Sequence, residues 1–351
     1  TFQGNVDGAS LTINGNGGIL NLGTSLTHTF SGAWTRNVGT LNGGSSTLRL
    51  GGSVSGTGGT FTAGTGTVEY NGASQTIANV TYNNLIFSGT NTKTIGAAIS
   101  VSGALSINTG VVANLGTFSH SVGSLTLAGN GTASGSWGST SSSATYKNNT
   151  FFAATAGVLN VTSATWRTPS VTVTPVGSYT YNGASQGPNA ATNTGSSLSY
   201  SFSYTGVAPT VYPASATRPT NAGNYTVTAT VAASSDGFWA SASSDAASFS
   251  IDRLQLTITA PTVTKVYDGT VNAGTVTLGT VGNAVSGETP GIAGSATAYS
   301  SKNVASNYSV TVSYTLSNNG AFLASNYSTP SNNTITNASI TARQLTITAP
   351  T

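Results

Sequence analysis

The chain has 351 residues, with 10 Lys and Arg, 7 Asp and Glu, a net charge of +3 and no Cys. So few basic residues cannot follow a phosphate backbone, which excludes nucleic acid as a partner, and the lack of Cys excludes thiol catalysis, disulfides and thiolate metal sites. The sequence contains 60 Thr, 50 Ser and 44 Gly, and 37% of its residues are apolar. Because disordered chains usually combine low hydrophobicity with high charge, this composition predicts a folded, all-β protein with many turns.

The first 168 residues predict a parallel β-solenoid-like region that is rich in Gly, Thr and Ser. Short apolar and Thr-rich strands recur about every ten residues and are separated by Gly or Asn-Gly. A weaker internal repeat relates LTIN at 11–14 and NLGT at 21–24 to LSIN at 105–108 and NLGT at 114–117. Coils that stack aliphatic residues inside and Thr, Ser and Asn outside are typical of a solenoid, and another β-sandwich is the alternative.

Two divergent copies of one design are predicted at 169–252 and 253–342. The octapeptide QLTITAPT at 255–262 recurs at 344–351, 89 residues later. The segment 343–351 therefore reads as the first strand of a further repeat. Since the sequence begins at Thr and stops inside this repeat, we expect it to be a piece of a longer protein.

The two copies share turn and core marks. In each, Tyr is followed by Asn or Asp and then by Gly, which tolerates the positive φ of a tight turn. An Asn-Tyr pair then opens a strand of alternating apolar and hydroxyl side chains. We therefore expect two superposable Ig-like β-sandwich modules whose marked tyrosines lie in the core or pair strands. The marks are Tyr181, Asn182, Gly183, Tyr225, Tyr267, Asp268, Gly269 and Tyr308.

These motifs resemble known repeat families. KVYDGT at 265–270 and SKNVASNYSVTV at 301–312 look like a YDG repeat, whereas YTYNGASQGP at 179–188 and RPTNAGNYTVTATV at 218–231 look like an MBG repeat. The segment 68–107 is similar to solenoid-like parts of the same proteins. The resemblance implies a giant repetitive bacterial cell-surface adhesin or extracellular filament protein, with a structural and adhesive role, an extracellular location and no catalytic residue.

Enzymatic chemistry has little support in the sequence. The first 168 residues contain only two acidic residues, Asp7 and Glu69, whereas a glycosidase or lyase needs two convergent carboxylates. The lone His28 and His120 occupy corresponding places in the internal repeat, and we expect both at one structural position on the coil surface. We therefore expect no enzyme activity, no cofactor and no metal site.

Two further readings stay open. One is a carbohydrate- or ice-binding module, in which sugar rings would stack on one or more of Trp34, Trp137, Trp166 and Trp239. The other is an intramolecular Lys–Asn crosslink beside an acid in 253–342, with candidate residues Lys265, Lys302, Asp268 and Glu288.

The scarcity of charge also bears on partners. Unpaired strand edges are usually protected by Lys, Pro or charge, so we expect these edges to be covered by neighbouring modules or by copies of the same protein. Surface glycans are a further expected class of partner. The short link SIDRLQ at 250–255 predicts close packing of consecutive modules. No run of 18 apolar residues predicts a membrane span in this piece, and no basic-then-apolar start predicts a targeting peptide.

Overall fold

The computed structural model describes residues 1–195 and 199–347, and over these ranges the protein is all-β, as the composition predicted. The one helix within them is a short 3-10 turn, η1 (Ala324–Asn326), and none of their helices is long and apolar enough to cross a membrane. The chain forms two compact units. Unit 1 comprises Thr1–Ser170, Asn193–Ser199 and Val231–Ala242, and unit 2 comprises Val171–Thr192, Tyr200–Thr230 and Ser243–Thr351.

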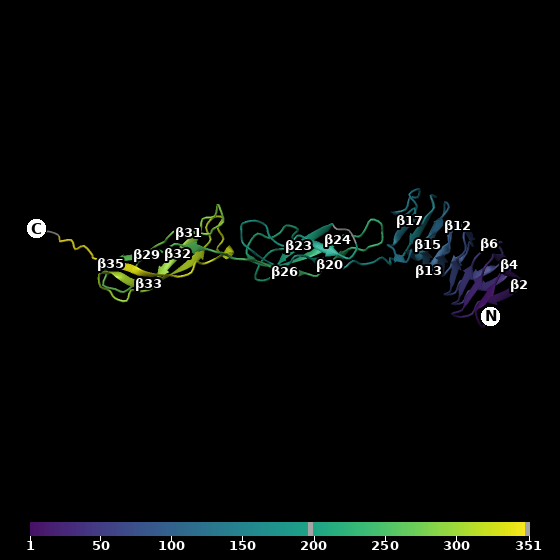
Figure 1. The fold of residues 1–351 in the computed structure, drawn as a ribbon, viewed down its shortest axis with the longest axis horizontal. Helices are drawn as coiled ribbons and strands as arrows, with labels where there is room; N and C mark the ends of the chain where they lie inside the picture. Colours follow the sequence, from purple (N-terminus) through teal and green to yellow (C-terminus); the bar gives the residue numbers. More distant parts are fainter. Residues whose placement is uncertain (196–198, 348–351) are drawn as a thin grey trace. The chain divides into compact units, whose positions relative to one another are not determined.

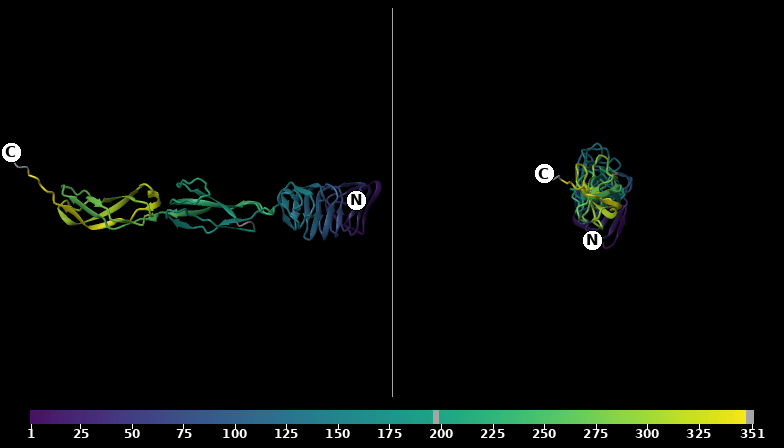
Figure 2. Two further views of the ribbon diagram at one scale, coloured as in Figure 1. Left: turned by 90° about the horizontal axis from the view of Figure 1, so that it is seen from above. Right: turned by 90° about the vertical axis from the view of Figure 1, so that its left-hand side faces the viewer.

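Unit 1 is built on the predicted β-solenoid, which has about six turns (Figures 1 and 2). Its main sheet runs, in spatial order, through β1 (Val6–Gly8), β3 (Thr27–Phe30), β5 (Thr47–Leu50), β8 (Thr67–Tyr70), β11 (Asn84–Phe87), β13 (Ser100–Ile107), β15 (Ser119–Leu127), β19 (Val158–Val161), β17 (Gly135–Gly138) and β18 (Tyr146–Lys147). Beside this path, β13 pairs with β10 (Thr81–Tyr82) and β15 pairs with β16 (Asn130–Gly131).

Two smaller sheets complete the coils. The first contains β2 (Leu11–Asn21), β4 (Trp34–Asn42), β6 (Val54–Ser55) and β7 (Thr60–Thr62). The second contains β14 (Val111–Asn114), β12 (Asn91–Ile95) and β9 (Gln75–Ile77). Pairing within both is parallel, as expected when successive coils stack in one direction.

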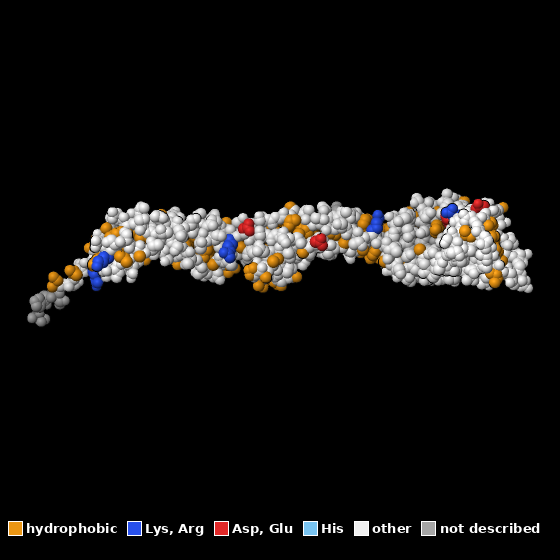
Figure 3. All heavy atoms as spheres, turned by 90° about the horizontal axis from the view of Figure 1, so that it is seen from below, with side chains coloured by type: hydrophobic (Ala, Val, Ile, Leu, Met, Phe, Trp, Pro, Cys, Tyr) orange, Lys and Arg blue, Asp and Glu red, His pale blue; other side chains and the backbone are white. Residues whose placement is uncertain are grey.

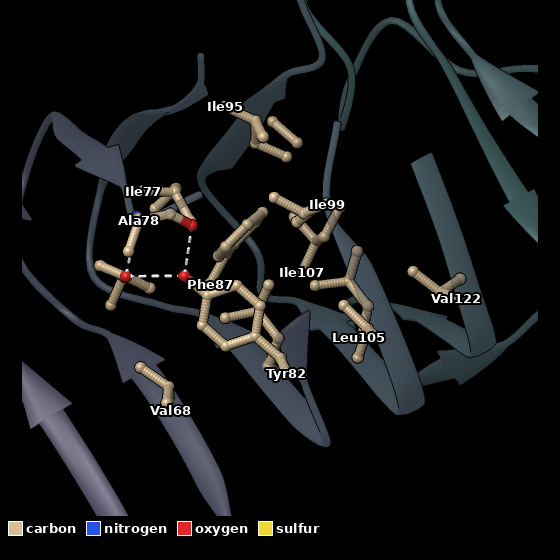
Figure 4. Packing of buried hydrophobic residues seen from close by; sticks show 14 of the residues in the cluster. Val68, Ile77, Ala78, Tyr82, Phe87, Ile95, Ile99, Leu105, Ile107 and Val122 are labelled. Atoms are coloured by element: carbon tan, nitrogen blue, oxygen red, sulfur yellow. Dashed lines mark hydrogen bonds between the residues drawn. The ribbon is translucent and has the colours of Figure 1, made fainter. Parts of the chain in front are cut away.

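The alternation of side chains along the main-sheet strands builds the core. Thr27 lies beside Thr47, and Thr47 beside Thr67, so one coil takes 20 residues there. Every second residue points inward and stacks on its counterpart in the next coil. One inward ladder runs through Leu48, Val68, Leu85, Leu105 and Leu125, and the next through Phe30, Leu50, Tyr70, Phe87, Ile107 and Leu127. Figure 4 shows Phe87, Leu105 and Ile107 in this packing.

The prediction that the two histidines share one position on the coil surface is wrong on both counts. Both are buried, and His28 lies in the ladder that runs from Leu48 to Leu125, whereas His120 lies beside Leu159. His28 and His120 are fully buried on β3 and β15, and their Nε2 atoms lie 2.7 Å and 3.0 Å from the carbonyl oxygens of Leu22 and Leu115. These carbonyls belong to the repeated NLGT corners, so each imidazole satisfies a corner carbonyl inside the coil. The two histidines therefore share a hydrogen-bond partner of the same kind, and the register suggested by the internal repeat does not hold in the strand pairing.

Two other buried polar side chains satisfy corner carbonyls in the same way. Gln75 donates from Nε2 to Leu50 and Gly52, at 2.8 Å each. Lys93 donates from Nζ to the carbonyls of Gly72, at 2.6 Å, and of two neighbouring loop residues. No Asp or Glu pairs with Lys93 among the described residues, and its burial lowers the pKa of the ammonium to about 8.

The last coil of the solenoid is covered by the segment Val231–Ala242. Phe238 packs edge-on against the buried Trp137, with ring centroids 5.8 Å apart. The Gly237 carbonyl accepts a hydrogen bond from Ala133 N at 2.8 Å, and Arg167 exchanges backbone bonds with Phe238 and Ala240. Since an open coil end exposes both apolar side chains and backbone groups, this segment serves as the cap of unit 1.

Unit 2 contains two modules, which we call the first module (its segments before residue 253) and the second module (253–342). The sheets of the first module contain β20 (Val171–Val173) with β22 (Ala191–Asn193), and β21 (Ser178–Thr180), β26 (Ala247–Asp252), β24 (Gly223–Val231) and β23 (Tyr200–Gly206), with β25 (Ala242–Ser243) beside β24.

The sheets of the second module contain β27 (Leu254–Gln255) with β34 (Tyr327–Ser328), β28 (Thr257–Ile258) with β31 (Val281–Gly282), and the larger sheet β30 (Thr275–Thr277), β29 (Thr262–Val266), β35 (Asn333–Thr341), β33 (Ala305–Ser317) and β32 (Gly291–Ala296). The order β21-β26-β24-β23 in the first module matches β29-β35-β33-β32 in the second. In both, the first pair is parallel and the second antiparallel. The Ig-like sandwich expected from the sequence stays a prediction.

The strand predicted at 343–351 does not form over its described part. Residues 343–347 are exposed and lie outside any strand, and residues 348–351 lie outside the described residues. Their counterparts β27 and β28 pair with β34 and β31, which come later in the second module. The 351-residue sequence holds no such later strands for 343–347 to pair with.

The buried Lys93 predicts a pH dependence of the stability of unit 1. Its pKa is about 8 in the folded chain against an ordinary 10.5, so the unfolded chain binds more protons between these pH values. The free energy of unfolding should rise by about 1 to 2 kcal/mol from pH 8 to pH 10. Denaturant titrations followed by Trp fluorescence measure it, since Trp34, Trp137, Trp166 and Trp239 all lie in unit 1.

Two variants and a second pH range make this test more specific. Lys93→Met should abolish the rise, whereas Lys147→Met, at an exposed position, should keep it. Burial raises the pKa of Tyr70 to about 12, so the unfolded chain loses its proton first and stability should fall again above pH 10. A rise of equal size in the Lys93→Met chain would contradict the assignment.

Candidate functional site at the module junction

The contacts between the first and second modules converge on five residues, which we call the module junction. They are Tyr181 and Asn221 of the first module and Glu288, Asn326 and Tyr327 of the second. The short Arg253 link between β26 and β27 keeps these residues close in space. The sequence reasoning expected close module packing from this link and did not name the residues that achieve it.

Glu288 is held by two tyrosine hydroxyls. Tyr181 donates to Oε1 at 2.6 Å and Tyr327 donates to Oε2 at 2.9 Å, so one carboxylate bridges both modules. The two rings meet edge-on with centroids 5.4 Å apart. Burial, with the Glu288 carboxylate adding to it, raises the pKa of Tyr181 to about 12 and also raises that of Tyr327, so both hydroxyls remain protonated donors at neutral pH.

Asn326 forms the second set of contacts across the junction. Its side chain is fully buried, and its Oδ1 accepts a hydrogen bond from Ala222 N at 2.9 Å while its Nδ2 donates to Asn221 Oδ1 at 3.1 Å. Beside these bonds, Val285 packs on Gly183, because a Cβ placed there would lie 2.8 Å from Val285 Cγ1. The junction therefore combines a charge-assisted pair, an amide pair and a close backbone approach.

Local turn chemistry places Tyr181 at the junction. Tyr181 directly follows β21, and its N–H donates to the Asp252 carbonyl at 2.9 Å. The Asn182 Oδ1 then accepts from Ala184 N at 2.9 Å, and Gly183 takes φ +79°. An Asx turn followed by a positive-φ Gly thus turns the chain directly after the tyrosine.

Of the remaining marked residues, Tyr225 supports the junction residue Asn221, and the others belong to the second module outside the junction. Tyr225 and Tyr308 are buried, and their hydroxyls donate to the carbonyls of Asn221 and Asn303, each at 2.7 Å. Asp268 Oδ1 accepts from Thr270 N at 2.9 Å, and Gly269 also takes φ +79°.

Tyr267 was expected in the core or in strand pairing. It is 37% exposed and so lies outside the core, and its N–H donates to the Thr341 carbonyl at the end of β35. Its counterpart Tyr181 is buried beneath the second module, and the 351-residue sequence has no further module to cover Tyr267.

Sequence reasoning missed Asn326 and Tyr327 and gave Glu288 a different role. Glu288 was considered only as the acid of a Lys–Asn crosslink. Instead, Lys265 pairs with Asp268 at 2.8 Å and donates to Thr270, whereas Lys302 is exposed. Glu288 is one of the two Glu in the whole sequence, and this rarity was the signal available for its role.

Other parts of the surface offer little chemistry. An open groove of about 940 Å³ beside the junction is lined mainly by polar residues, including Tyr212, Arg218 and Asp252. Within residues 1–195 and 199–347, no group of three or more His, Cys, Asp or Glu could hold a metal ion. Figure 3 shows a surface that is mostly uncharged, with isolated basic and acidic side chains.

The tryptophans considered for sugar stacking mostly serve packing. Trp34 and Trp137 are buried in the solenoid core. Trp166 packs against that core, and the Arg167 guanidinium lies 4.3 Å from the centroid of Trp239. Both of these last two rings are half-buried.

Comparison with known proteins gives one match. The family model described as YDG domain matches residues 252–335, the stretch that holds the Tyr-Asp-Gly turn and the second module's share of the junction. No curated protein and no solved structure matches the chain.

Replacing Glu288 tests the junction. Glu288→Gln removes the negative charge and replaces one of the two acceptor oxygens by an NH2 group, which cannot accept from a tyrosine hydroxyl. The modules should therefore separate more often, and trypsin should cut faster after the exposed Arg253. The pKa of Tyr181, read by ¹³C NMR of labelled tyrosine, should fall from about 12 while staying above 10, because burial is the larger cause.

Glu69→Gln is the matched control, because Glu69 pairs with Arg49 inside unit 1. It should leave the cleavage rate and the Tyr181 titration unchanged. Equal behaviour of the two variants would show that Glu288 does not hold the modules together.

Proposed function

We propose that this chain is a structural and adhesive part of a long bacterial cell-surface protein or extracellular filament, and that it carries no chemistry of its own. The observation that carries the proposal is the module junction, where Glu288 bridges Tyr181 and Tyr327. A junction of this kind transmits position and force from one module to the next. Binding and catalytic proteins have no general need for it.

Three further observations support this role. The solenoid is a stack of similar coils whose last coil is capped, an architecture that supplies length with few distinct contacts. The sequence is rich in Ser and Thr and poor in charge, and the face drawn in Figure 3 carries few charged side chains. The QLTITAPT repeat and the match to a YDG domain point to a modular protein.

The finer parts of the proposal rest on resemblance. The motifs YTYNGASQGP and RPTNAGNYTVTATV favour an MBG-type repeat for 169–252. The shared strand order of the two modules supports one common, Ig-like design for both. Arrays of such repeats in bacterial surface adhesins suggest an extracellular location, with neighbouring modules or copies of the protein as partners.

Labelling of intact cells tests the proposal. An antibody against this chain should label unpermeabilised cells that produce it, and external protease should remove the label. Cells that lack the gene should attach to surfaces less well than their parents, with attachment restored by the intact gene. Labelling that appears only after permeabilisation would refute the surface role.

A further inference from the structure

The far end of the second module carries a face that corresponds to the one the first module presents at the junction. We call it the distal face and define it by Tyr267, Gly269, Asn303 and Val304. The Tyr267 N–H donates to the Thr341 carbonyl at 2.8 Å, as Tyr181 does to Asp252. Both tyrosines therefore stand directly before the same kind of turn, at the end of the same pair of parallel strands.

The asparagines of the two faces also correspond. The Tyr308 hydroxyl donates to the Asn303 carbonyl, just as Tyr225 donates to Asn221. Asn303 and Val304 thus occupy the places where the first module presents Asn221 and Ala222 to Asn326.

The distal face is uncovered. Tyr267 is 37% exposed, whereas Tyr181 is 4% exposed. A Cβ at Gly183 would meet Val285 at 2.8 Å, and a Cβ at Gly269 would meet nothing within 4 Å. Val304, the counterpart of Ala222, is 53% exposed.

The segment after the second module points to the occupant of this face. Gln344–Thr351 repeats the sequence of Gln255–Thr262, which opens the second module. Leu256 is 1% exposed in that setting, whereas its counterpart Leu345 is 85% exposed and Ile347 is 90% exposed. The QLTITAPT segment is therefore buried at its leucine where the rest of a module follows it, as at 255–262.

We propose that the distal face binds the N-terminal end of a second copy of the 253–342 module, with 343–347 following the course of 254–258. In this complex the Tyr267 hydroxyl donates to Glu288 of the added copy, whose Val285 covers Gly269 and whose Asn326 meets Asn303. The inference rests on the proposed structural role and names the partner within it.

Charge at the distal face is compatible with this partner. The turn residue corresponding to Asn182 is Asp268, which could repel an incoming Glu288. Its carboxylate is already paired with Lys265 at 2.8 Å and bonded to Thr270, so the face presents no unpaired negative charge. Because a module that carries both faces binds head to tail, the same contact can recur from one module to the next.

The test extends the full chain by a copy of residues 263–342 placed directly after Thr351, so that 344–351 act as its opening strands. Arg253 lies at the existing junction and Arg343 at the new one, and both are exposed in the 351-residue chain. Trypsin cleavage after Arg343 should slow about tenfold or more in the extended chain relative to the original.

Glu288→Gln supplies matched controls within the same molecule. In the added copy it should restore fast cleavage after Arg343 and leave Arg253 unaffected. In the original copy it should speed cleavage after Arg253 and leave Arg343 protected. Tyr267→Phe in the extended chain should also restore cleavage after Arg343, because it removes only the hydroxyl.

An unchanged cleavage rate after Arg343 in the extended chain would overturn the proposal, as would protection that survives both Glu288→Gln in the added copy and Tyr267→Phe. Failure of the added copy to fold, seen as a missing gain in near-ultraviolet Tyr dichroism, would also overturn it, because the register is part of the proposal. Cell labelling is read independently, so failure of the docking and failure of the surface role are distinguishable.

Discussion

Buried polar side chains that bond to backbone carbonyls are the contacts on which the solenoid depends. Several coils turn at corners where buried carbonyls accept from side chains, and a buried carbonyl left unpaired costs about 1 to 3 kcal/mol. Gln75 and Lys93 donate to the carbonyls of Gly52 and Ala73. Together with His120 they also add side-chain donors to Leu50, Gly72 and Leu115, carbonyls that accept from backbone N–H groups as well. These donors lie on strands themselves, among the aliphatic and aromatic side chains that fill most inward positions.

At the module junction, too, a polar side chain satisfies groups away from solvent, but here it is an acidic acceptor. A single half-buried carboxylate, Glu288, accepts from two hydroxyls that belong to different modules. In a chain with 7 acidic residues, there is little nearby charge to compete for these donors. Two of the few charged groups, Lys93 and Glu288, are thus used at a coil corner and at the module junction.

Patterns of alternation and turn residues predicted the all-β fold, the solenoid and the turns at Gly183 and Gly269, because these features follow from local chemistry. Side-chain environments set by distant residues were harder to predict. The hexamer YNGASQ occurs at 70–75 and 181–186, yet Gln75 is buried among coil carbonyls whereas the half-buried Gln186 bonds back to Thr180. Likewise, Tyr181 and Tyr267 share their turn and differ in burial, since only Tyr181 is covered by another module.

The cap of unit 1 has a consequence for how the protein can be divided. Val231–Ala242 lies far along the sequence from the coils it covers, and it shields Trp137 through Phe238. A fragment that ends where the solenoid strands end would expose this tryptophan and the last unpaired backbone groups to other chains. Recombination between related genes would face the same limit, so the solenoid and the segment that caps it have to be inherited together.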